Sequence, residues 1–193
     1  VYVFTSVLLK TIKDMQPDYM AAAFDLAGPT FRHEEYEEYK AHRQKAPDEL
    51  YAQIPLIQEV LKAFGVEIFE KESYEADDLI GSLAEKAKKN QQEGGLQTVI
   101  LTGDLDTLQL VDNDKVVVFT LRKGVTDTVI YNEKAVKERF GFGPKTMIDY
   151  KALRGDPSDN IPGVKGIGEK TATELLKKYG NLSVEGELFK VQI

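Results

Sequence analysis

Short apolar runs of strand length alternate with helical segments over the first 120 residues, and this alternation limits what the chain can fold into. The apolar runs are Tyr19–Phe24, Val66–Phe69, Thr98–Leu101 and Lys115–Thr120. Before the first run, and in two of the segments between runs, apolar residues recur at every third or fourth position. This spacing predicts helices over Val3–Met15, Asp48–Phe64 and Glu75–Asn90. Strands that alternate with helices of this length favour an α/β fold with a parallel-rich sheet flanked by helices.

The pattern changes after Tyr131. Two short helices, each closed by a glycine, are predicted over 132–143 and 143–155. A glycine-rich turn then enters a helix that ends at Gly180, and no strand pattern is present in this part of the sequence. We therefore expect two domains, an α/β core over residues 1–130 and a small helical module over residues 131–193.

The composition excludes several classes of function. The chain has no cysteine, which rules out disulfides, zinc–thiolate sites and cysteine nucleophiles. No apolar run approaches the roughly 20 residues of a membrane span and no signal peptide opens the sequence, so we expect a cytoplasmic protein without a membrane partner. The net charge of −7 would argue against a nucleic-acid partner, but many of the acids are concentrated in a few clusters and basic residues gather locally elsewhere.

Eight carboxylates lie in four short clusters, each at the edge of an apolar segment. They are Asp25; Glu75, Asp77 and Asp78; Asp104 and Asp106; and Asp156 and Asp159. Acids this close repel one another unless cations neutralise them, and hard oxygen ligands suit Mg²⁺ or Mn²⁺. Functional groups gather beyond the carboxyl ends of parallel strands, so we predict a metal site there that acts on phosphate. Helix-start acids and turn formers are the alternative explanation for single members of the set.

Basic and aromatic residues follow the first of these acids, in the segment FRHEEYEEYKAHRQ. Arg32, Lys40 and Arg43 are spaced to bind a phosphate, and Tyr36 or Tyr39 could stack on a base. Mixed charge at helical spacing is also typical of a solvated helix, and spacing alone does not separate the two interpretations.

A second candidate for phosphate contact is the turn GVKGIGEK. Gly163, Gly166 and Gly168 allow a tight hairpin that can approach another backbone closely, and the next helix directs free N–H groups at that turn. Lys165 and Lys170 add charge for contacts with a nucleic-acid backbone that do not depend on sequence. An ordinary helix–turn–helix connection with surface lysines is the alternative, and the acid pair directly upstream favours the binding interpretation.

Taken together, four motifs closely resemble the flap-endonuclease family, in particular the 5′-nuclease (5′-3′ exonuclease) domains of bacterial DNA polymerase I. The motifs are FDLAGPTFRHEEYEEYKAHR, YEADDLIG, LTGDLDTLQLV and LRGDPSDNIPGVKGIGEKTA. They occur in the family's order, and the resemblance runs from about Val3 to Leu182. It implies a PIN-like α/β domain followed by a helix–hairpin–helix module, and a role in replication and repair.

The resemblance also implies roles for individual residues. The eight acids are similar to the family's metal-site acids, which hold two Mg²⁺ or Mn²⁺ ions, and Asp104 counts among the catalytic residues. Lys40 and Arg43 resemble the basic residues that reach the scissile phosphate, with Arg32 in support and Tyr39 among the DNA-binding residues. The hairpin with its glycines and lysines resembles the duplex-binding turn, which in the family often holds K⁺ through backbone carbonyls.

The implied substrate is DNA with a 5′ flap, a nick or a 5′ end, with an RNA primer in an RNA/DNA hybrid as a further partner. We expect a monomer, fused to a polymerase domain in the longer protein. Three alternatives stay open: a DNA-binding fragment that does not cleave, a stand-alone 5′-3′ exonuclease and a PIN-type ribonuclease.

Two departures from the family pattern bear on these expectations. The family opens with a buried strand that ends in a metal-binding aspartate, and Val1–Phe4 corresponds to the segment after it. Leu105 stands where many relatives carry lysine or arginine between the two aspartates. We therefore expect an incomplete nuclease domain, truncated at both ends.

Overall fold

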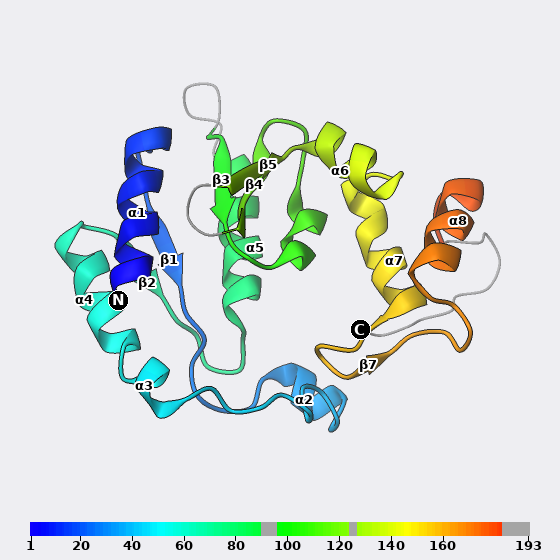
Figure 1. Cartoon of the computed structure of the whole chain (residues 1–193), viewed down its shortest axis with the longest axis horizontal. Coiled ribbons are helices and arrows are strands. Elements are labelled where there is room, and N and C mark those ends of the chain that lie inside the picture. The colour runs from blue at the N-terminus through cyan, green and yellow to red at the C-terminus, as the bar shows by residue number, and fades with distance from the viewer. Residues whose placement is uncertain (90–95, 124–126, 183–193) are drawn as a thin grey trace.

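Parallel strand pairs with helices packed against them make up the part of the chain before residue 132 (Figure 1). The computed structural model describes residues 1–89, 96–123 and 127–182. The elements of this part are α1 (Tyr2–Met15), β1 (Ala21–Ala23), α2 (Phe31–Glu35), α3 (Asp48–Tyr51), α4 (Ile54–Ala63), β2 (Glu67–Phe69), α5 (Ala76–Lys89), β3 (Thr98–Leu101), the 3₁₀ helix η2 (Leu105–Leu110), β4 (Val116–Lys123) and β5 (Asp127–Tyr131). After them come α6 (Glu133–Phe140), the 3₁₀ helix η3 (Pro144–Thr146), α7 (Met147–Arg154), β6 (Gly155–Asp156), β7 (Ile161–Pro162) and α8 (Glu169–Tyr179).

Parallel pairing is confirmed, but it is divided between two small sheets. β1 pairs in parallel with β2, and β3 pairs in parallel with β4. β4 also pairs antiparallel with β5, a strand that the sequence does not predict and that its neighbour stabilises. Among the described residues, no hydrogen-bonded pairing joins β1 to β3. Helix α5 contacts both of these strands and so connects the two sheets.

Two hydrophobic clusters hold the chain together. The smaller one centres on Leu8, Leu61 and Val66, where α1 and α4 pack beside the β1–β2 pair. The larger one extends from β3, β4 and η2 through α5 into α6, α7 and α8. Fully buried members such as Leu108 and Tyr150 therefore belong to one core, although they lie on opposite sides of the predicted boundary at 130/131. That boundary remains a prediction. No helix among the described residues is both long and apolar enough to cross a bilayer.

The prediction of one continuous helix over Asp48–Phe64 is wrong. The structure has two helices, α3 and α4, with Ala52 and Gln53 between them. Pro55 explains the break, because proline has no N–H to donate and is tolerated in the first turn of a helix but not in its interior. It lies in the first turn of α4.

The segment with mixed charge is helical only over α2, which ends at Glu35. Turns follow it from Glu37 to His42, and each closes through a backbone hydrogen bond such as Arg43 N–H to Lys40 O at 2.9 Å. Neither of the two early interpretations predicts turns here.

The helices after β5 agree with the predicted ones, and their glycine ends have a clear reason. Gly141, Gly155 and Gly180 follow α6, α7 and α8 with φ values of 82°, 77° and 87°, a region that only glycine adopts without strain. The expectation that no strand occurs here is wrong, because β6 pairs antiparallel with β7. Two residues per strand are too few for a sequence pattern to show.

Gly155 and Gly163 bring two backbone segments into direct contact. A Cβ on Gly163 would lie 2.3 Å from the carbonyl carbon of Arg154, and a Cβ on Gly155 would lie 2.3 Å from the nitrogen of Gly163. Neither position has room for a side chain, so both must remain glycine. The close backbone approach that the sequence predicts for Gly163 is confirmed, and the second backbone belongs to the same chain.

We expect Gly163→Ala to lower the free energy of unfolding by about 3 kcal/mol, because the obstacle is backbone and cannot move aside. Chemical denaturation followed by circular dichroism measures this change. Gly103→Ala is the matched control, since a Cβ there would meet nothing within 4 Å. Equal stabilities of the two variants would contradict the prediction.

Candidate active site

The predicted acids lie at element ends, as their positions in the sequence indicate. Asp25 follows β1, and Asp104 and Asp106 follow β3. Glu75, Asp77 and Asp78 are at the start of α5. The last two come from the helical module, Asp156 in β6 and Asp159 in the loop that leads to β7.

Asp25 and the start of α5 are joined directly. The Asp25 Oδ1 atom accepts a hydrogen bond from the Ala76 N–H at 2.6 Å, as an acid placed at a helix N-terminus should. Asp77 follows in the first turn of the same helix, and its carboxylate is close to those of Asp104, Asp25 and Glu75. Partial burial and these three acids raise the pKa of Asp77 to about 6.

Asp78 caps α5 and binds Arg32. Its Oδ2 atom accepts the Glu75 backbone N–H at 2.9 Å, and both its oxygens accept the Arg32 guanidinium at 2.8 Å. The hydrogen bonds from Arg32 hold the pKa of Asp78 below its usual range. Arg32 also lies over the Phe31 ring, 4.6 Å from its centroid. This bidentate pair attaches α2 to the first turn of α5.

Glu75 is bound by the residues that follow α2. Lys40 donates from Nζ to Glu75 Oε1 at 2.7 Å, and the Tyr39 hydroxyl donates to Glu75 Oε2 at 3.0 Å. Tyr39 is 5% exposed, so it packs against its own chain in this structure, and base stacking by Tyr39 stays a prediction. Burial and the adjacent Glu75 and Asp159 carboxylates raise the pKa of the Tyr39 hydroxyl, which therefore stays protonated as a donor.

Asp159 brings the loop between β6 and β7 against the same turns. Its Oδ1 accepts from the Arg43 guanidinium at 2.8 Å, and its Oδ2 lies 3.2 Å from the Tyr39 hydroxyl. Lys40 thus binds an acid at the start of α5, and Arg43 binds an acid in the loop between β6 and β7.

Lys151 on α7 is a site residue that the sequence does not reveal. Its Nζ atom lies 2.6 Å from Asp106 Oδ1 and 2.6 Å from Asp156 Oδ2. The pKa values of the two acids shift in opposite directions. Burial raises that of Asp106, whereas for Asp156 hydrogen bonds from Lys151 and Ser158 outweigh burial and hold the pKa well below its usual range. A lysine within an amphipathic helix carries no signal by itself, and only the fold places it between two acids.

Asp104 lies at the start of η2 and orders the turn that carries it. Its Oδ1 atom accepts the Asp106 N–H at 2.8 Å, and its own N–H donates to Thr102 Oγ1 at 3.0 Å. The turn-forming alternative therefore describes Asp104 correctly. Its exposed carboxylate nevertheless also faces Asp77 closely enough to raise the pKa of that acid.

The acids are not arranged as a ready-made metal centre. Within residues 1–89, 96–123 and 127–182, no group of three or more acid or histidine side chains is placed to hold a metal ion. Arginine and lysine side chains bind five of the acids individually, namely Glu75, Asp78, Asp106, Asp156 and Asp159. The donor set still fits a hard divalent cation, because every donor is a carboxylate oxygen and, after burial, the neighbouring acids contribute to the raised pKa of Asp77.

The hairpin residues are divided between packing and surface. Gly163 contacts the chain's own backbone, whereas Gly166, with φ of 84°, forms the turn and Gly168 precedes the first residue of α8. Lys165 and Lys170 are exposed beside them. The lysines are thus available to a ligand, and Gly163 acts by packing.

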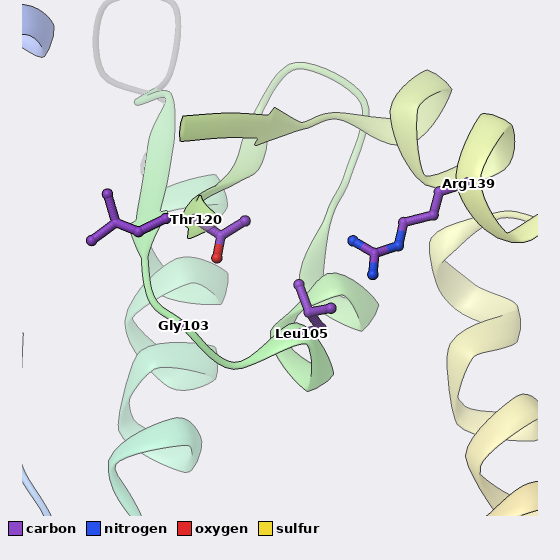
Figure 2. A pocket seen from close by; sticks show the side chains of 5 residues that line it. Gly103, Leu105, Thr120 and Arg139 are labelled. Atoms are coloured by element: carbon purple, nitrogen blue, oxygen red, sulfur yellow. The ribbon is translucent and has the colours of Figure 1, made fainter. Parts of the chain in front are cut away.

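Two surface pockets lie beside the acids but do not contain them. One of about 340 Å³ is lined by Gly103, Leu105, Thr120, Leu121 and Arg139. Figure 2 shows Arg139 extending from α6 toward the turn at Gly103 and Leu105. The other, of about 510 Å³, lies between α6 and α8. None of the eight acids lines either pocket; Asp25, Asp77 and Asp104 are exposed, whereas Asp156 is buried.

Comparison with known proteins identifies the same family that the sequence motifs indicate. A family model described as 5′-3′ exonuclease, N-terminal resolvase-like domain, matches residues 1–141, and one described as 5′-3′ exonuclease, C-terminal SAM fold, matches residues 142–186. DNA polymerase I of Caldicellulosiruptor bescii is 50% identical over 185 residues, which is 94% of this chain and 21% of that protein. This chain thus spans about a fifth of the length of that relative.

Two solved structures are also similar. T5 5′-exonuclease with bound zinc has a TM-score of 0.70 at 25% identity, over 92% of this chain and 66% of that chain. A complex of bacteriophage T5 flap endonuclease with DNA and metal ions has a TM-score of 0.70 at 26% identity, over 94% of this chain and 66% of that chain.

A resolvase-like α/β domain with exposed acids at its strand ends, followed by a small helical module that contributes two more, defines a nuclease of the 5′ class. The family models cover nearly the whole chain. The chain belongs to the 5′-3′ exonuclease family, and the enzyme class and fold expected from its motifs are confirmed.

We expect Lys151→Met to lower the free energy of unfolding of the metal-free protein by about 2 kcal/mol, because it leaves Asp106 and Asp156 unpaired. Mg²⁺ should restore much of this loss by neutralising the same acids. Urea unfolding in EDTA and in Mg²⁺ measures both effects. Lys134→Met, at a side chain that is 82% exposed, is the control and should stay within about 0.5 kcal/mol of wild type. A Lys151 variant as stable as this control would contradict the assignment.

We expect Asp77→Asn to stabilise the metal-free protein at pH 7. The pKa of Asp77 is about 6 in the folded protein against an ordinary 3.8, so its charged form destabilises the folded state above pH 6, and protonation relieves this as the pH falls toward 4. Allowing for solvent screening, the gain at pH 7 is about 1 kcal/mol.

Urea unfolding of both proteins in EDTA between pH 4 and pH 7 measures this difference, which should vanish near pH 4. Asp18→Asn, at an exposed acid outside the site, is the control. A gain at Asp77 that persists unchanged at pH 4 would show that charge is not its cause.

Proposed function

We propose that this chain hydrolyses phosphodiester bonds in DNA at 5′ ends, nicks and 5′ flaps with the help of divalent cations, Mg²⁺ or Mn²⁺. The observation that carries the proposal is that acids from both modules pair with Lys40, Arg43 and Lys151, mostly in partly exposed positions. An anionic polymer can reach such positions, and displacing a carboxylate from a lysine or arginine leaves a site for its phosphates.

The acids would hold the cations. Asp25, Asp77 and Asp104 are the first group, because their carboxylates are close enough to affect one another. Asp106, Asp156 and Asp159 are the second, and Glu75 lies next to both. Asp78 supports them through its cap and Arg32 rather than as a ligand. When bound, divalent cations supply charge neutralisation, polarisation of the phosphate and a hydroxide nucleophile at neutral pH.

Lys40 and Arg43 would stabilise the negative charge that develops on the transferring phosphate. The Lys40 side chain lies 2.7 Å from Glu75, and the Arg43 guanidinium lies 2.8 Å from Asp159. These contacts support the role, because both basic side chains already reach the acids. Arg32 would anchor the segment that carries them.

The exposed hairpin would bind duplex backbone. Lys165 and Lys170 give contacts that do not read sequence, so recognition would be of shape. The proposal also includes K⁺ at the hairpin carbonyls and an RNA primer as an additional substrate. It further includes a monomeric state, a cytoplasmic location and fusion to a polymerase domain. Fusion to a polymerase domain is supported by the DNA polymerase I relatives, because this chain spans only about a fifth of their length.

We expect Asp104→Asn to reduce flap cleavage at least about a hundredfold and to leave DNA binding within about twofold of wild type. The fold should not change, because an asparagine Oδ1 can still accept the Asp106 N–H. A labelled 5′-flap duplex with Mg²⁺ measures cleavage, and fluorescence anisotropy in EDTA measures binding. Asp18→Asn is again the control, and full activity of the Asp104 variant would remove this acid from the site.

A second candidate is a module that binds branched DNA without cleaving it. The absence of a ready-made metal centre among the described residues favours this possibility. Flap binding by the unmodified chain without any cleavage in Mg²⁺ or Mn²⁺ would support it over the nuclease.

A further inference from the structure

The loop between β6 and β7, residues 157–160, contacts the turns over residues 36–43 (Figure 1). We call these turns the basic turns, because they carry Lys40 and Arg43. Four hydrogen bonds join the two segments, and Asp159 takes part in three of them. The fourth comes from Asn160, which none of the predicted roles includes.

Asn160 contacts backbone and not a side chain. Its Nδ2 atom donates to the carbonyl oxygen of Glu38 at 2.8 Å, and the same oxygen also accepts the Ala41 N–H at 3.1 Å. The residue is half-buried, and its φ of 59° is one that asparagine adopts more readily than most residues. The backbone of the loop thus turns in a way that directs this amide at the centre of the basic turns.

The conformation of Lys40 depends on the same contact surface. Lys40 has φ of 56°, which is unfavourable for a residue with a Cβ, and its N–H donates to the Asp159 carbonyl oxygen at 2.9 Å. The loop thus binds the backbone of Glu38 through Asn160 and the backbone of Lys40 through Asp159, on the two sides of Tyr39 in sequence. The Tyr39 hydroxyl itself binds Glu75 and Asp159. The basic turns are therefore held by their backbone, and the side chain of Lys40 is directed at Glu75.

The loop is also connected to the hairpin. Asn160 lies three positions before Gly163, whose backbone is packed against Arg154 and Gly155. The Val164 N–H donates to the Leu153 carbonyl at 2.8 Å, which fixes the start of the hairpin on α7. A rigid path of a few residues thus leads from the hairpin to the basic turns.

We propose that Asn160 is a positioning residue: its side-chain amide holds the basic turns so that Lys40 and Arg43 face the acids, and it aligns them with the hairpin. The proposal rests on the proposed function for its kinetic consequence. The contact itself is a property of the fold and can be tested without a substrate.

The test uses two variants that both keep the positive φ accessible. Asn160→Asp removes the donor and keeps the shape, and Asn160→Gly removes the side chain. Losing one such hydrogen bond should speed limited trypsin cleavage after Lys40 and Arg43 about fivefold, with the circular dichroism spectrum unchanged. On a 5′-flap duplex with Mg²⁺, kcat should fall about fivefold and the Kd for the duplex should not change, a split that general destabilisation would not give.

Asn113→Asp and Asn113→Gly are the matched controls. Asn113 also has a positive φ, of 49°, but it is exposed, and within the described part of the chain its amide donates to the adjacent Asp112 alone. Tryptic rates of the Asn160 variants equal to those of the controls would overturn the proposal, and so would faster proteolysis with an unchanged kcat. If the unmodified chain cleaves no DNA, the proposed function fails, and the proteolysis comparison still decides whether Asn160 holds the basic turns.

Discussion

Repulsion among the acids is the constraint on which the arrangement of this chain depends. Carboxylates this close repel one another, and cations that lie among them reduce the cost of folding. In the structure Arg32, Lys40, Arg43 and Lys151 each bind at least one acid. The first three belong to one segment, residues 32–43, and Lys151 lies on α7. At Asp77, burial and the neighbouring acids Asp104, Asp25 and Glu75 raise the pKa. An external cation beside these acids would reduce the repulsion among them.

Compensating ion pairs also unite the two parts of the chain. Lys151 bridges an acid after β3 and an acid in β6, and Asp159 binds the turns after α2. Together with a hydrophobic core that runs from β4 to α8, these contacts make the helical module part of the site and not an appendage. A duplex held by the hairpin would therefore be held in a defined relation to the acids.

Local pattern was sufficient for much of the fold. Periodicity predicts α1 and α5, glycines on either side predict α8, and the apolar runs place Asp25 and Asp104 at strand ends, because each of these features depends on neighbours in sequence. The features that could not be predicted depend on distant contacts. β5 is a strand because β4 lies beside it, Tyr39 is buried because Glu75 and Asp159 accept its hydroxyl, and Lys151 belongs to the site only through the fold. The motifs select the acids as candidates, but they do not show which lysine or arginine each acid binds.

The division of the strands between two sheets has a consequence for how the protein behaves in solution. Within the described residues β1 pairs only with β2 and β3 only with β4, so both strands have one edge without a strand partner. Val99 and Leu101 on β3 are 37% and 38% exposed, which adds apolar surface beside such an edge. Free strand edges are templates for further pairing. This region, rather than the strongly charged acid surface, is where copies of the chain would begin to associate as concentration rises.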